Sequence, residues 1–316
     1  MRRYMMASVV AGVLMFSTFA TAAPTRAIAT RWYVGSATHI SGGSCSDPDF
    51  TVDGTADNVQ VQAAADAALS GDIIVLCSGS FFFDDQVLLV EELYIIGAGI
   101  EETVISGQDT TRLFDSNSDL LLRDMTLEHG DSSGQNTCFA VYEDGGAVCG
   151  EQTLTLLNTA FQFNTTGEWG GAVAAGEVHI SNSQFTDNFA GDAPGGAVAT
   201  EDVSGAVSTI VGSTFVGNVG GNGGALSFSG NDNPKVTNND FVENIASSNG
   251  GAIDAVHVDV KSFNRNLFKK NVAALRGGAV WLGSSTMRRS VARFKMVNRF
   301  VLNSAGDRRS QLIYTP

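Results

Sequence analysis

The sequence has few charged residues, few prolines and, after its first twenty residues, no long apolar run. Charged residues make up 16% of the chain, proline occurs 5 times, and hydrophobic residues make up 43%. This composition is too apolar for a disordered chain, and the 36 glycines do not follow the triplet period of collagen. It predicts an ordered, turn-rich, mainly β chain that is long enough to bury a large core.

The N-terminus has the pattern of a secretory signal. Arg2 and Arg3 precede an apolar run from Met5 to Phe19, and the small residues Ala20-Thr21-Ala22 then form a cleavage site. The run is shorter than the roughly 20 residues that cross a bilayer, which disfavours a membrane anchor. We therefore predict a signal peptide over residues 1–22, a lead-in over 23–44, and an exported chain that is secreted or held at the cell surface or outer membrane.

The four cysteines allow three disulfide pairings. Disulfides persist in exported proteins, and two pairs, Cys45–Cys77 and Cys138–Cys149, each bracket one compact stretch of chain, so we predict these two bonds. A metal site is the alternative, but the sequence contains no Cys-x-x-Cys and its four histidines lack ligand spacing. We expect neither a metal nor a cofactor.

The negative charge is confined to the first three quarters of the chain. Residues 1–234 carry 6 Lys or Arg and 28 Asp or Glu, a net charge of −22, whereas residues 235–316 carry 13 and 5, a net charge of +8. The acidic body argues against nucleic acid as a partner. The basic segment could bind an anionic surface, although its charges are scattered among Phe and Asn positions, which favours a solvated face.

Two short motifs recur through the second half of the chain. The first is Gly-Gly-Ala followed by Val, Leu or Ile, at spacings of 25 to 28 residues. Its glycines are Gly145, Gly146, Gly170, Gly171, Gly195, Gly196, Gly223, Gly224, Gly250, Gly251, Gly277 and Gly278. The second, Phe-x-x-Asn, stands eight to ten residues before the next Gly-Gly-Ala. Its residues are Phe161, Asn164, Phe185, Asn188, Phe215, Asn218, Phe241, Asn244, Phe268 and Asn271.

A repeat of this length holds three short strands and three bends, which make one coil of a parallel β-helix. Stacked coils would align like side chains into Phe, aliphatic and Asn columns. The Gly-Gly pair indicates a corner that needs positive φ or close backbone approach, and the Asn indicates left-handed backbone that bonds turn amides. We predict an all-β, right-handed parallel β-helix over residues 45–283.

The two ends of this solenoid differ. The stretch from Val59 to Leu69 is the one convincing helix, and Ser70-Gly71-Asp72 ends it, so we predict a capping helix near 59–70 that covers the first coil. At the other end, Phe300 and Asn303 repeat the second motif, but Lys295 stands five residues before Phe300 and no Gly-Gly-Ala follows. We expect the register to fail after Trp281 and residues 284–316 to form a degenerate or truncated coil.

Three stretches carry a family resemblance. The segment from Val59 to Cys77 and the segment from Ile96 to Gly107 look like the opening of exported pectin-lyase-like β-helix proteins. The alternating Gly-Gly-Ala-[Ile/Leu/Val] and Phe-x-x-Asn motifs from Gly145 onward resemble the polymorphic outer membrane protein repeat family. The resemblance implies a right-handed β-helix at the cell surface with a role in adhesion.

An enzyme of the pectin-lyase-like fold is the rival interpretation. A polysaccharide lyase would need carboxylates for calcium and a basic residue to abstract a proton. The acidic residues to consider are Asp115, Asp119, Asp124, Glu128 and Asp131, with Arg112 and Arg123 as nearby bases. Gln108-Asp109-Thr110 resembles a motif of pectin methylesterases, but its partner elements are missing.

Strand alternation would point Arg123 and the alternate acids outward without any catalytic role, because their apolar neighbours point inward. We therefore assign no catalytic, cofactor-binding or metal-binding residue. The predicted function is a non-catalytic β-helix that binds a surface glycan or protein, with a polysaccharide lyase or glycoside hydrolase as the alternative. We predict no nucleic-acid partner and no transmembrane segment in the mature chain.

Overall fold

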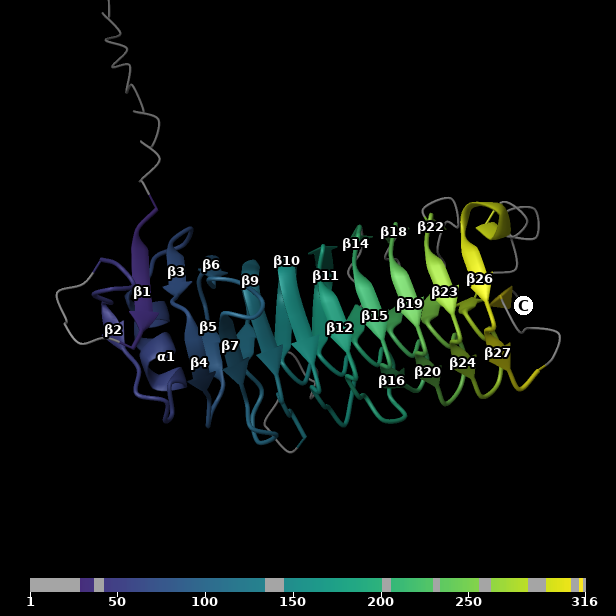
Figure 1. Ribbon diagram of the computed structural model, residues 1–316, viewed down its shortest axis with the longest axis horizontal. Coiled ribbons are helices and arrows are strands. Elements are labelled where there is room, and N and C mark those ends of the chain that lie inside the picture. Colours follow the sequence, from purple (N-terminus) through teal and green to yellow (C-terminus); the bar gives the residue numbers. More distant parts are fainter. Residues whose placement is uncertain are drawn as a thin grey trace, which may run out of the picture.

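The computed structural model describes residues 29–36, 43–133, 145–200, 206–229, 234–255, 263–283, 294–307 and 313–314. Over these residues the chain is an all-β, right-handed parallel β-helix, with coils stacked along the longest axis of the molecule (Figure 1). The predicted signal peptide, residues 1–22, and Cys138 lie outside the described residues.

Three faces of parallel strands build the coils, and every pair of neighbouring strands in them runs parallel. The first face contains β1 (Arg31–Gly35), β3 (Ile73–Leu76), β6 (Leu93–Ile96), β9 (Leu120–Glu128), β10 (Val148–Gln162), β11 (Val173–Ser181), β14 (Thr209–Val211), β18 (Lys235–Thr237) and β22 (Phe263–Asn264). β2 (Phe50–Thr51) adds to β1.

The second face follows the first after one bend. It contains β4 (Gly79–Phe82), β7 (Thr103–Ser106), the ends of β9 and β10, β12 (Gln184–Thr186), β15 (Thr214–Val216), β19 (Asp240–Val242), β23 (Leu267–Lys269) and β26 (Arg299–Val301). A short sheet lies beyond it: β16 (Val219–Gly220), β20 (Ile245–Ala246), β24 (Val272–Ala273) and β27 (Ser304–Ala305).

The third face closes each coil, and from the start of β10 to β25 its strands follow the Gly-Gly corners. It contains β5 (Val87–Leu89), β8 (Phe114–Ser116), the starts of β10 and β11, β13 (Val198–Thr200), β17 (Leu226–Phe228), β21 (Ile253–Ala255), β25 (Val280–Leu282) and β28 (Ile313–Tyr314). β10 contributes to all three faces, because it bends twice while it stays paired with the neighbouring strands.

Columns of identical side chains fill the interior. The phenylalanines of the repeat stack ring on ring from Phe161 to Phe300, with centroids 4.8 to 5.0 Å apart. This distance matches the spacing of neighbouring strands. The position of each ring is therefore determined by the strand that carries it. An aliphatic column, including Leu156, Ile180 and Ile210, lies beside the rings and is fully buried.

The asparagines of the repeat form a second, polar column inside the coils. Each side-chain amide donates to the Oδ1 of the next Asn, as from Asn188 Nδ2 to Asn218 Oδ1 at 2.9 Å, and also to a backbone carbonyl. Positive φ falls one residue before the Asn, as at Phe163 (57°), so the prediction of left-handed backbone at the Asn itself is wrong. The physical reason is that the Asn side chain must point inward to bond the next coil.

The Gly-Gly corners combine both backbone properties that the sequence pattern indicates. The first glycine takes positive φ, 72° at Gly195, whereas the second passes close to the next coil. A Cβ on Gly196 would lie 2.1 Å from the carbonyl oxygen of Gly224. Only glycine allows the coils to approach this closely at the corner.

The helix α1 (Asn58–Ala67) covers the first coil (Figure 1). Its buried side chains, which include Val61, Ala64 and Ala65, pack on the end of the apolar interior. A disulfide between Cys45 and Cys77 ties the segment before the helix to the end of β3. Cys149 is also disulfide-bonded.

The prediction that the register fails after Trp281 is wrong for the described residues. β26 pairs with β23 so that Phe300 follows Phe268, and Asn303 accepts from Asn271 Nδ2 at 2.9 Å. The aliphatic position is filled by Phe294, six residues before Phe300 and not five, at the start of a short helical segment over 294–297. The helical segment accommodates one extra residue. The five-residue spacing therefore failed to predict this coil, although its side chains continue the columns of the interior.

Candidate functional site

The outer side of the first face has a groove near the N-terminal end of the β-helix. In this face the buried residues Ile74, Ile95 and Leu122 alternate with residues that point outward. Two aligned outward columns result: Ile73, Tyr94, Leu121 and Thr155 lie in one, and Ile96 and Arg123 lie in the other. An apolar strip with one aromatic ring therefore crosses several coils.

Polar walls border this strip. The main groove has a volume of about 880 Å³ and is lined by Ile73, Tyr94, Leu121 and Arg123, together with the turn over residues 69–72. An adjoining hollow of about 200 Å³ adds Asp119 and Thr153 and shares Tyr94 with the main groove. We call these two hollows together the Tyr94 groove.

The ionisable groups of the Tyr94 groove are held by hydrogen bonds. Tyr94 Oη donates to Glu92 Oε1 at 3.1 Å, and Asp119 Oδ1 accepts from the Thr153 amide at 3.0 Å. The guanidinium of Arg123 is paired with Asp124, at 2.9 Å between Nε and Oδ2. Arg123, the cation that lines the groove, is thus paired with its neighbour, whereas Glu92 and Asp119 add two further carboxylates to the walls.

Asp72 has a structural role at the edge of the groove. Its carboxylate accepts from the amides of Thr30, at 2.7 Å, and Leu69, at 3.0 Å, and from the indole of Trp32 at 3.3 Å. Burial acts to raise the pKa of Asp72, but the hydrogen bonds from Leu69 and Thr30 outweigh it and the pKa is lowered. The charged carboxylate therefore holds the turn that forms one wall.

The structure separates the acidic residues that the enzyme interpretation brought together. Arg112 is fully buried, where it donates to the carbonyl of Gly145 and lies 3.8 Å from Asp115. Asp119 and Asp124 lie at or beside the Tyr94 groove, whereas Glu128 accepts from Gln162 on the second face. Asp131 caps a turn by accepting from the Ser133 amide.

No three or more His, Cys, Asp or Glu side chains converge as a metal site within the described ranges.

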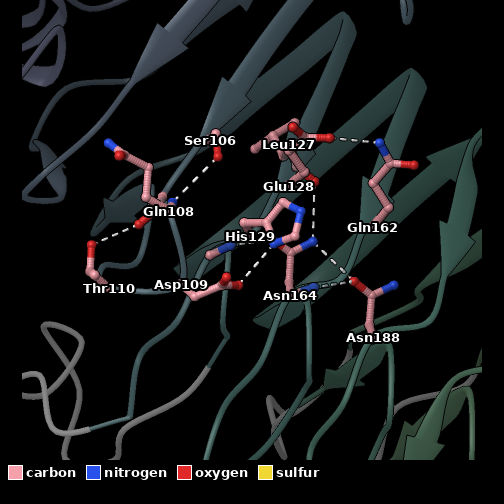
Figure 2. A network of polar contacts seen from close by, with 12 residues as sticks. Ser106, Gln108, Asp109, Thr110, Leu127, Glu128, His129, Gln162, Asn164 and Asn188 are labelled. Carbon is pink, nitrogen blue, oxygen red and sulfur yellow. Dashed lines mark hydrogen bonds and ion pairs between the residues drawn. The ribbon is translucent and has the colours of Figure 1, made fainter. Parts of the chain in front are cut away.

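The Gln108-Asp109-Thr110 segment lies at a corner of the second face. Figure 2 shows Asp109 beside His129, with 2.9 Å between Oδ1 and Nδ1, and Thr110 turned back to a backbone carbonyl. Gln108 and Asp109 both take positive φ, and Phe163 stacks on the His129 ring at 5.4 Å. Both members of the Asp–His pair are exposed, so these contacts shape and cover a corner.

The repeat residues place no functional group on the surface. Figure 2 shows Asn164 pointing inward, where it bonds the Leu127 carbonyl and Asn188. The repeat motifs therefore indicate the interior.

Of the groove residues, Asp119 and Arg123 were considered from the sequence, but Tyr94 and Leu121 were missed. Their signal was available in the outward positions of the first strands, where Tyr94 and Leu121 replace the polar residues typical of an exposed face.

Comparison with known proteins gives one limited similarity. Over 75 residues the chain is 33% identical to the probable autotransporter YfaL of Escherichia coli (strain K12). The aligned part covers 21% of this chain and spans only 6% of the length of that protein. No family model matches the chain, so membership of the polymorphic outer membrane protein repeat family stays a prediction.

Along the described parts of the chain, no helix is both long and apolar enough to cross a membrane.

Proposed function

We propose that this chain is an exported, non-catalytic β-helix protein of the cell surface or the secreted space, and that it binds an uncharged glycan in the Tyr94 groove. The single observation that carries the proposal is the groove itself. It combines an aromatic ring and an apolar floor with polar walls, which is the mixture that small-molecule and saccharide sites require.

Charge favours an uncharged ligand over an acidic one. Glu92 and Asp119 line the Tyr94 groove, and Arg123 is already paired with Asp124. A polyanion would meet two uncompensated carboxylates there, and like charges at short range disfavour binding. An uncharged sugar chain can instead place a ring face on Tyr94 and its hydroxyls on the carboxylate oxygens.

Export is supported by two further features. The disulfide between Cys45 and Cys77 is of the kind that persists outside the reducing cytosol. The relative in Escherichia coli is named a probable autotransporter, which is a class of exported protein. We infer that the predicted signal peptide directs the chain across the inner membrane.

Intact-mass measurement of the protein recovered from the extracytoplasmic fraction tests the export proposal. The expected mass lacks residues 1–22, and a full-length mass confined to the cytosol would contradict it.

Binding is tested by screening the folded protein against a panel of neutral and acidic oligosaccharides, followed by calorimetry on the neutral hits. Tyr94→Ala and Leu121→Ser should each weaken binding at least about tenfold, because each removes contact area at the centre of the site. Val211→Ser, on the same face but outside the groove, is the matched control and should bind like the parent. Equal loss in the control, or hits confined to acidic sugars, would refute the assignment.

The absence of catalysis is tested separately. The protein is incubated with polygalacturonate and calcium while the absorbance of unsaturated product is followed. The proposal expects no product, and product formation would favour the polysaccharide lyase instead.

A further inference from the structure

Five exposed cations gather where the last described coils stack. We call Arg265, Lys269, Lys270, Lys295 and Arg299 the C-terminal basic face. Lys269 and Arg299 flank the inward-pointing Phe268 and Phe300 on paired strands of the second face, so both point outward on adjacent coils.

The remaining cations border these two strands. Lys270 follows Lys269 at the corner, and the Arg265 amide donates to the Val297 carbonyl at 2.7 Å, which places Arg265 against the segment that carries Lys295.

Among the described residues, a single ion pair involves the C-terminal basic face. Lys270 pairs with Glu243, at 2.7 Å between Nζ and Oε1. The hydrogen bond and charge of Lys270, with a smaller contribution from the charge of Lys269, lower the pKa of Glu243. Within the described parts of the chain, no ion pair involves Arg265, Lys269, Lys295 or Arg299. Asp240, in register with Leu267 and Arg299, adds a further carboxylate on the neighbouring coil.

Apolar side chains stand out beside the cations. Met296 is 84% exposed and Leu302 is 75% exposed, the highest values among the exposed large hydrophobic residues of the described chain. Leu302 occupies the same corner position as Lys270, which stays exposed although the next coil stacks on it. The corner position itself therefore leaves the side chain of Leu302 exposed.

We propose that the C-terminal basic face, with Met296 and Leu302, docks the β-helix on an anionic lipid bilayer. Cations attract acidic headgroups at about 1 kcal/mol each near a surface, and adjacent apolar side chains enter the boundary between headgroups and acyl chains. A soluble polyanion would use the cations but not the apolar side chains. The acidic body, with a net charge of −22 over residues 1–234, is repelled from the same surface.

This distribution of charge sets the orientation of the molecule. The coils at the right-hand end of Figure 1 contact the bilayer, and the coils of the Tyr94 groove at the opposite end are held away from it. The docking does not depend on glycan binding, because the two surfaces lie on different coils.

Co-sedimentation with vesicles tests the docking. The folded chain is mixed with vesicles of pure phosphatidylcholine and with equimolar phosphatidylcholine and phosphatidylglycerol, at low and at physiological ionic strength. Binding is expected to the anionic vesicles and to weaken with salt. The Lys269→Gln/Arg299→Gln variant should lose about 30-fold in partitioning, or about fivefold for each cation.

The matched control is Arg31→Gln/Lys235→Gln, which removes two exposed cations of the first face and should bind like the parent. Met296→Ser/Leu302→Ser keeps every charge and should also weaken binding. Circular dichroism confirms that each variant is folded.

Three results would overturn the proposal: equal binding to both vesicle types, equal losses in the test and control variants, or binding to heparin or DNA without binding to vesicles.

Discussion

Substituting one asparagine of the interior column tests what holds the coils together. Asn218 is fully buried and takes part in four side-chain hydrogen bonds. Its Nδ2 donates to Asn244 Oδ1 at 2.9 Å and to the Phe185 carbonyl at 3.0 Å. Its Oδ1 accepts from the amide of Asn188 at 3.1 Å and from Asn188 Nδ2 at 2.9 Å.

Asn218→Ala removes the side-chain partner of these buried groups, although Asn244 Oδ1 still accepts from the backbone amide of residue 218. Two donors on Asn188 and the carbonyl of Phe185 lose a bond, and each such loss costs about 1–3 kcal/mol. Because the neighbours relax in part, we expect a total loss of about 3–5 kcal/mol in the free energy of unfolding, which is large for a single substitution.

The matched control is Asn238→Ala. Asn238 is exposed, with a φ of 60°, so this change costs only about 1 kcal/mol of left-handed backbone strain. Urea unfolding followed by circular dichroism measures both variants.

Hydrogen exchange at the amides of Asn188 and Asn218 locates the effect, because a solenoid can open coil by coil. Equal destabilisation of the two variants, or unchanged exchange at these amides, would show that the column contributes no net stability.

Three further outcomes follow from the interior. Gly196→Ala should prevent the coils from stacking and yield insoluble protein, whereas Gly167→Ala, which meets no atom within 4 Å, should express and unfold like the parent. Replacing Cys45 and Cys77 by Ser should remove roughly 4 kcal/mol of loop-closure stabilisation for a separation of 32 residues, seen as faster proteolysis of the first coils. Burial raises the pKa of Asp254 to about 7, so its protonated form is favoured in the fold, and stability should fall as pH rises from about 4 to about 7. Asp254→Asn should flatten urea midpoints over that range, and an unchanged slope would contradict the buried carboxyl.

The candidate site was less predictable than the repeat. The acidic residues from Asp115 to Asp131 form a cluster in the sequence, but successive strand positions point to opposite sides and the intervening turns separate them further. Tyr94 and Leu121, in contrast, stand 27 positions apart in the chain and become neighbours through the register of β6 and β9. Local spacing cannot report such a contact where the repeat motifs are absent.

The sequence by itself determined the coil. The Gly-Gly-Ala and Phe-x-x-Asn motifs predict the corner, the phenylalanine column and the asparagine column, because each of these three features depends on one residue type at one repeated position. Only the tertiary structure decided which side chains share an outer surface. The Tyr94 groove and the C-terminal basic face arise from register between coils, and Phe294 shows that packing can restore a column which the spacing in the sequence had lost.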